Sequence, residues 1–190
     1  MDEFIFRNPL TAEEFEAREE EFHDRFGGDE NEEGHGHSDE FPFIEFVGAD
    51  SRLYGLEAHA DVNVTSSLVA EMTFDMVRGE LVDGDQPLPR IPPFRLIPGL
   101  RYQKNALQFG GSVAITGDQN RVFGAETPTP GAGVLKLFGS YSFVAGGITN
   151  TITARLDNAT DRLYRNHLNY LKDVLPEMGR NFKVVYSVQF

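Results

Sequence analysis

The residues best suited to chemistry lie in one short stretch near the start of the chain. His35 and His37 stand two residues apart between glycines, in the sequence GHGHSDE of residues 34–40. Imidazole combined with carboxylate suits zinc, nickel or copper, whereas a chain without cysteine offers no thiolate for a tight structural metal site. The candidate metal ligands are these two histidines together with His23, Asp29, Glu30, Glu32, Glu33, Asp39 and Glu40.

The same stretch also fits an acidic surface loop whose histidines are incidental. Residues 11–40 carry 13 acids against Arg18 and Arg25, which gives a local net charge of -11 out of -13 for the whole chain. Such a density of like charge cannot pack into a core, so residues 9–40 are predicted to form a solvated insertion. The two remaining histidines, His59 and His167, are interpreted as structural residues rather than ligands.

Composition excludes several classes of function. The acidic chain has 17 basic residues against 30 acids, which argues against binding nucleic acid. Uninterrupted apolar runs are far shorter than the roughly 18 residues that a membrane-spanning helix needs. No nucleophile elbow, phosphate-binding glycine loop or His-Glu-x-x-His pair is present, so the chain is predicted not to be an enzyme and to carry no prosthetic group.

From residue 41 onward apolar and polar side chains alternate, which is typical of β-strands with one apolar face. In the last ten residues, for example, Phe182, Val184, Tyr186, Val188 and Phe190 occupy every even position. The alternation predicts about seven full strands and the end of one more. These are recognised at residues 4–8, 53–64, 68–76, around Tyr102, and at 107–115, 135–143, 152–156 and 182–190.

The connections between the predicted strands alternate between short and long. Short ones fall near residues 65–67, 103–106 and 146–148, and long ones near 9–40, 79–93, 117–133 and 159–179. An up-and-down meander would place all short turns at one end, as in outer-membrane barrels with periplasmic turns and extracellular loops. Four aromatic residues would then form a girdle near the turns: Tyr102, Phe109, Phe143 and Phe190.

Two fold classes account for this alternation. One is an all-β, antiparallel, up-and-down transmembrane β-barrel segment, and the other is a soluble β-sandwich. A sandwich core favours large aliphatic residues over the Gly-, Ala- and Thr-rich filling found here, so the barrel is preferred. Within the acidic insertion, Phe15, Phe22 and Phe26 predict an amphipathic helix over residues 12–26 that could fold against the barrel mouth.

Two segments carry a resemblance to a known family. Residues 158–167 (NATDRLYRNH), followed by residues 171–181 (LKDVLPEMGRN) and a strand ending at Phe190, resemble the end of TonB-dependent outer-membrane receptors. Residues 88–95 (LPRIPPFR) resemble a loop-to-strand segment of the same family. The resemblance implies a 22-stranded barrel plugged by an N-terminal domain, which imports scarce nutrients with energy from the inner-membrane TonB complex.

The resemblance also sets expectations for domains and cargo. It is closest to the zinc-uptake branch, whose extracellular loops are rich in histidine and acid, so Zn²⁺ is the expected cargo. A siderophore or another metal chelate is an alternative, as is a small stand-alone barrel with a structural or adhesive role. Because no signal peptide, plug or TonB-contacting box precedes residue 4, residues 1–190 are expected to be the C-terminal portion of a longer receptor, with residues 9–40 as an extracellular loop.

The expected location is the outer membrane. The expected partners are the lipid bilayer, the TonB complex through the missing plug, the barrel-assembly machinery, and a metal ion or metal chelate. The alternating end of the chain is similar to the signal that the assembly machinery reads, although the same residues also fit a plain lipid-facing strand end. The residues of this predicted signal are Val184, Tyr186, Val188 and Phe190.

Overall fold

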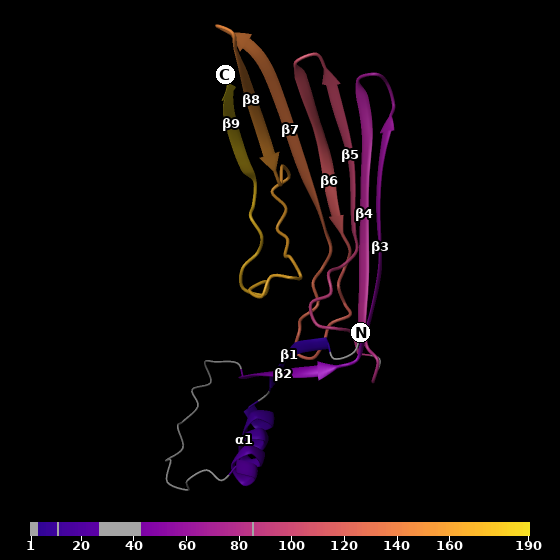
Figure 1. Cartoon of the computed structure of the whole chain (residues 1–190), viewed down its shortest axis with the longest axis vertical. Helices are drawn as coiled ribbons and strands as arrows, with labels where there is room; N and C mark the ends of the chain where they lie inside the picture. Colours follow the sequence, from indigo (N-terminus) through magenta and orange to yellow (C-terminus); the bar gives the residue numbers. More distant parts are fainter. Residues whose placement is uncertain (1–3, 11, 27–42, 85) are drawn as a thin grey trace.

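The computed structural model describes residues 4–10, 12–26, 43–84 and 86–190. The described residues form nine strands and one helix, arranged as a long sheet with a smaller unit at one end (Figure 1). The elements are β1 (Phe4–Leu10), α1 (Ala12–Phe26), β2 (Phe43–Ala49), β3 (Ser51–Asn63), β4 (Leu68–Leu81), β5 (Arg95–Lys104), β6 (Leu107–Thr116), β7 (Ala132–Ala145), β8 (Ile148–Asp157) and β9 (Asn181–Gln189).

The seven strands β3 to β9 form one antiparallel sheet in which each strand pairs with the next along the chain. The short turns at residues 64–67, 105–106 and 146–147 lie at one end of this sheet, together with the C-terminus (Figure 1). The long connections lie at the other end. The predicted all-β meander and its asymmetry of turns and loops are therefore confirmed.

Strand β1 does not belong to the long sheet. It pairs with β2 in a separate two-stranded sheet, with Phe6 opposite Val47. The predicted strand at residues 4–8 is therefore present, but it joins this small sheet and not the long one. The physical reason is that alternation reveals which side chains share a face but not which strand is the partner. Here β1 packs against the connection between β6 and β7, since the rings of Phe6 and Phe123 lie 5.0 Å apart.

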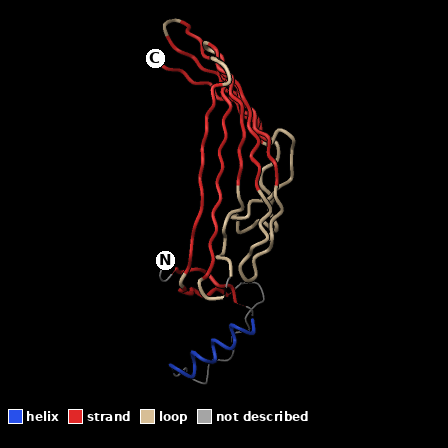
Figure 2. The backbone as a smooth tube through the Cα atoms, turned by 90° about the vertical axis from the view of Figure 1, so that its right-hand side faces the viewer, coloured by secondary structure: helices blue, strands red, loops and turns tan. Residues whose placement is uncertain are grey.

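The predicted helix is present as α1, with Glu13 and Glu14 in its first turn. Acidic side chains there interact favourably with the helix dipole. Helix α1 adjoins β1 and extends away from the seven-stranded sheet, so the expected packing of this helix over the mouth is not seen (Figures 1 and 2). In the part of the chain that the structure describes, no helix combines the length and hydropathy needed to cross a membrane.

The long sheet is a single layer whose apolar face is uncovered. Among the described residues no second sheet packs on it (Figure 2), and Leu56 and Leu100 in its middle are 57% and 54% exposed. A β-sandwich would bury this face, so the sandwich alternative is wrong. The strand register places the following side chains on the one apolar face: Leu56, Ala60, Val62, Ala70, Met72, Leu96, Leu100, Phe109, Val113, Leu135, Leu137, Ile152, Leu156, Phe182, Val184 and Tyr186.

The apolar core gathers instead at the end that carries the long connections. Leu81 at the end of β4, Leu88 and Phe123 in the connections, and Phe6 of β1 form one buried cluster. At the opposite end, near the turns, the rings of Tyr102 and Phe109 lie 5.0 Å apart on the apolar face, in the position of the predicted aromatic girdle. Side-chain packing therefore holds the long connections in place, whereas backbone hydrogen bonds between strands hold the sheet together.

Close approach of two strands makes Gly110 a sensitive position. A Cβ atom on Gly110 would lie 2.4 Å from the Leu100 carbonyl oxygen and 2.9 Å from Cε1 of Phe138. We expect Gly110→Ala to destabilise the sheet by roughly 1–3 kcal/mol through overpacking. The midpoint of urea unfolding, followed by circular dichroism, measures this change.

Gly133→Ala is the matched control, because only Cγ1 of Val113 lies within contact distance of the added carbon, at 3.8 Å. This variant should unfold at the wild-type midpoint. Equal midpoints for the Gly110 and Gly133 variants would show that the close approach in the structure does not constrain the sheet.

Candidate functional site

The face of the sheet opposite the apolar one carries charged side chains in cross-strand pairs. Between β4 and β5, Nε of Arg101 lies 2.6 Å from Oε1 of Glu71. Nε of Arg95 lies 2.9 Å from Oδ2 of Asp75. Pairs of this kind neutralise the charges locally and contribute roughly 0.2–1 kcal/mol each. The polar face thus carries two ion pairs between β4 and β5.

His59 lies on this polar face, where both of its ring nitrogens have partners. Nδ1 lies 3.0 Å from Oγ1 of Thr73 across the β3–β4 pair, and Nε2 lies 3.1 Å from Oδ1 of Asp61. This arrangement agrees with a structural role for His59. Over the described residues, no group of three or more His, Cys, Asp or Glu side chains is placed to hold a metal ion.

The predicted metal ligands fall almost entirely outside the described residues. Along the chain they fall between α1, which ends at Phe26, and β2, which begins at Phe43. His23 lies on α1, where only the backbone is described. The ligands that lie outside are Asp29, Glu30, Glu32, Glu33, His35, His37, Asp39 and Glu40.

At this same end, buried polar contacts join the connections 82–94, 117–131 and 158–180. Lys172 is 5% exposed, and its Nζ donates to the Thr127 carbonyl oxygen at 2.7 Å and to the Thr127 hydroxyl. The backbone N–H of Arg90 donates to Oε1 of Glu126 at 3.0 Å. We call these contacts the loop junction. They tie residues 36 and 45 positions apart in the chain, so the three connections hold one another in place.

His167 lies at the centre of the loop junction and is 2% exposed. Its Nδ1 lies 2.9 Å from Oγ1 of Thr129, whereas its Nε2 has no hydrogen-bond partner among the described residues and lies 4.0 Å from Oε2 of Glu126. Burial lowers the pKa of His167 below the ordinary value of 6.5, although Glu126 opposes this effect. The ring is therefore neutral at pH 7, and its proton sits on one nitrogen only.

Two further side chains shape the connection 158–180. Asn158 is buried with a positive φ of 49°, and its side-chain amide donates to the carbonyl oxygens of Arg162 at 2.9 Å and Met178 at 3.1 Å. Asp173 accepts a hydrogen bond from the Thr127 hydroxyl at 2.7 Å, and this bond lowers the pKa of Asp173 below its ordinary value. The start and end of the connection are thereby held together beside the first residue of β9.

The burial of His167 and its contact with Thr129 agree with the interpretation of this residue as structural, whereas its neighbours Glu126 and Thr129 were not predicted from the sequence. The signal was present in part, because segments 88–95 and 158–181, which carried the family resemblance, are two of the segments that meet at the loop junction. What the pattern does not reveal is which of their polar residues face one another.

The chain matches no protein-family model and no curated protein. Among solved structures it is similar to the copper transporter OprC, with a TM-score of 0.72 and 26% sequence identity over 78% of this chain. OprC is a TonB-dependent outer-membrane transporter, not an enzyme, and the seven-stranded sheet resembles part of its barrel. The matched region is 25% of the OprC chain, so the present chain spans about a quarter of that protein's length.

Acidification should loosen the loop junction through His167. Because the folded pKa lies below the unfolded value of 6.5, the unfolded connection takes up a proton first, and stability is lost as the pH falls below 6.5. We expect amide hydrogen exchange in residues 118–131 and 166–175 to become faster as the pH is lowered from about 7.5 to about 5.5, once the pH dependence of the intrinsic exchange rate has been corrected for.

His167→Gln is the control for this effect, because it retains a side-chain donor for Thr129 but does not titrate. The variant should show a flat pH profile in the same peptides. A wild-type pH response that persists unchanged in His167→Gln would assign the effect to another group.

Proposed function

We propose that this chain forms part of the barrel wall of a TonB-dependent outer-membrane receptor that imports a metal cation. The observation that carries the proposal is the single-layer sheet with an uncovered apolar face and a face of paired charges. In a bilayer the strands satisfy one another's backbone groups, the apolar face contacts lipid, and the polar face lines the lumen. The similarity to OprC supports this assignment.

In this proposal the long connections face the cell exterior and the short turns face the periplasm. Energy would come from the TonB complex through a plug, as in the family that the sequence resembles. The barrel-assembly machinery would read the end of β9, where Val184, Tyr186 and Val188 share the apolar face and Phe190 is fully exposed. The hydroxyl of Tyr186 donates to Oδ1 of Asn150, which holds this end of β9 against β8.

The proposed cargo is a divalent transition-metal ion captured at the outer end. Support comes from His35 and His37 with their neighbouring carboxylates. OprC is named as a copper transporter. For imidazole and carboxylate ligands Cu²⁺ binds more tightly than Zn²⁺, so the metal in use depends on supply as well as affinity. Zinc remains the cargo suggested by the family resemblance.

A single cation in the middle of the apolar face tests the membrane assignment. Leu100 lies on this face between Ala70 of β4 and Gly111 of β6. We expect Leu100→Arg to destabilise the bilayer-inserted protein by roughly 2–4 kcal/mol, because the guanidinium would enter the hydrocarbon region. Urea unfolding from phosphatidylcholine vesicles measures the change.

Ser140→Arg is the matched control, since Ser140 lies on the polar face opposite Gln108 and Thr153. On this face the arginine should change the free energy of unfolding little. If both variants unfold alike in vesicles, the apolar face does not contact lipid and the proposed membrane location is overturned.

Metal capture is tested by calorimetric titration of the full chain with Cu²⁺ and with Zn²⁺. We expect binding of both ions, tighter for Cu²⁺, and roughly a 10- to 100-fold loss of affinity in the double variant His35→Ala/His37→Ala. His59→Ala is the control and should bind as the wild type does, because His59 lies on the polar face with Thr73 and Asp61.

Absence of heat with either ion, or equal affinity in the double variant, would remove the free metal as cargo. If the protein binds a ferric siderophore but neither Cu²⁺ nor Zn²⁺, the result would favour a receptor for a metal chelate.

A further inference from the structure

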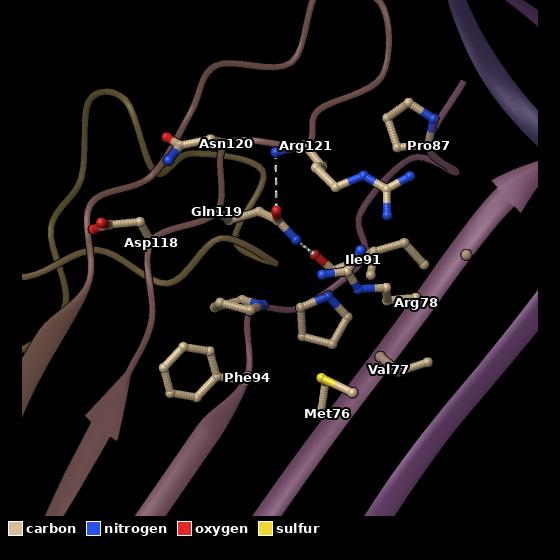
Figure 3. Close-up of a pocket in the computed structure, with 13 residues that line it drawn as sticks. Met76, Val77, Arg78, Pro87, Ile91, Phe94, Asp118, Gln119, Asn120 and Arg121 are labelled. Carbon is tan, nitrogen blue, oxygen red and sulfur yellow. Dashed lines mark hydrogen bonds between the residues drawn. The ribbon is translucent and has the colours of Figure 1, made fainter. Parts of the chain in front are cut away.

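A pocket lies where β4 continues beyond the end of β5. The last paired residues of the two strands are Asp75 and Arg95. Beyond them, segments 91–94 and 118–121 lie beside residues 76–79 of β4 and enclose a pocket with a volume of about 280 Å³ (Figure 3). The pocket is thus built by the loop end of the sheet rather than by the acidic insertion.

The pocket adjoins the apolar face of the sheet. Met76 and Arg78, which line it, alternate in phase with Met72 on that face, and Phe94 is in phase with Leu96. Tyr54 lies opposite Arg78 on the neighbouring strand β3. The apolar face therefore ends in an arginine beside a tyrosine, the pairing of polar and amphipathic side chains that occurs where hydrocarbon meets lipid headgroups.

The charge of this corner is positive. Arg78 is exposed and, within the described part of the chain, has no hydrogen bond or ion pair to another side chain. Nη2 of Arg121 lies 3.5 Å from Oε2 of Glu80, whose other oxygen lies 3.8 Å from Nη1 of Arg52. Glu80 is thus shared by two arginines, and Asp118 is the acid that lines the pocket itself. Three arginines against these two acids leave the corner positive, so it favours an anion.

The loop that carries Arg121 is held rigidly. Gln119 is buried, its Nε2 donates to the Ile91 carbonyl oxygen at 2.7 Å, and its Oε1 accepts the Arg121 backbone N–H at 3.1 Å (Figure 3). Oδ1 of Asp118 accepts a hydrogen bond from the Gly131 backbone N–H at 2.6 Å. The backbone of the loop 118–121 is therefore held in place at the pocket, which lowers the entropic cost of binding there.

We propose that this pocket binds the phosphate of a membrane-lipid headgroup. The guanidinium groups of Arg78 and Arg121 supply donors for phosphate oxygens, while Met76 and Phe94 contact the apolar part of the lipid. The inference rests on the proposed function, because lipid reaches the pocket only if the apolar face is embedded in a bilayer. It adds a bound lipid at the loop end of the wall, separate from the cargo site.

The test compares phosphatidic acid with diacylglycerol of the same acyl chains, so that the probes differ in the phosphate alone. Native mass spectrometry of the full chain, released from detergent, gives the fraction bound at each lipid concentration. We expect saturable binding of phosphatidic acid only, weakened about tenfold in Arg78→Gln through loss of one charge-assisted hydrogen bond. Arg155→Gln is the control, because Arg155 is an exposed cation on the opposite, polar face.

Equal loss in the Arg78 and Arg155 variants would overturn the site. Displacement of phosphatidic acid by millimolar inorganic phosphate would also overturn it, because the pocket would then select a free anion. The comparison of Leu100→Arg with Ser140→Arg in phosphatidylcholine vesicles separates the two proposals. If these variants differ as expected but phosphatidic acid binds equally with and without Arg78, only the lipid site is lost, whereas equal unfolding of the two variants removes the proposed function as well.

Discussion

The structure depends on one constraint, which is that a single layer of strands must satisfy its backbone through its neighbours alone. In β3 to β9 every strand pairs with the next in sequence, and each inner strand is paired on both sides. Among the described residues no second layer packs on either face, so the side chains of each face contact the medium on their own side of the sheet. The predominant alternation of apolar and polar residues follows from this, because a one-residue slip in register would reverse both faces.

The same constraint moves ordinary protein packing to one end of the sheet. Connections of a meander with short turns at one end must gather at the other, and there Leu81, Leu88 and Phe123 build a small core. The neutral ring of His167 and the buried ammonium of Lys172 are stable in this place only because neighbouring loops supply Thr129 and Thr127 as partners. The connections are therefore a folded unit supported by the sheet, while the sheet itself has no core.

How far the sequence predicts this structure follows from the range of each interaction. The alternation of side chains, the lengths of the turns and the spacing of Phe15, Phe22 and Phe26 are local features of the sequence. They were sufficient to predict the strands of the long sheet, its asymmetry of turns and loops, and helix α1. The partner of β1 and the contact of Lys172 with Thr127 join residues distant in the chain, and no local pattern encodes them. For the metal site, residue types identify the chemistry of His35 and His37, but a ligand set also requires geometry, which composition does not supply.

In the proposed receptor, the charge distribution would link the two faces to transport. On the polar face, Arg101 and Arg95 are paired with Glu71 and Asp75, so a cation that passed along this part of the wall would meet little net field. The unbalanced acids are concentrated instead in residues 11–40, with a local net charge of -11. A field from such a segment extends about one Debye length, roughly 8–10 Å at physiological salt. In the proposed receptor, attraction would act only near the entrance, and the neutral wall would leave the ion free to move inward instead of binding along the way.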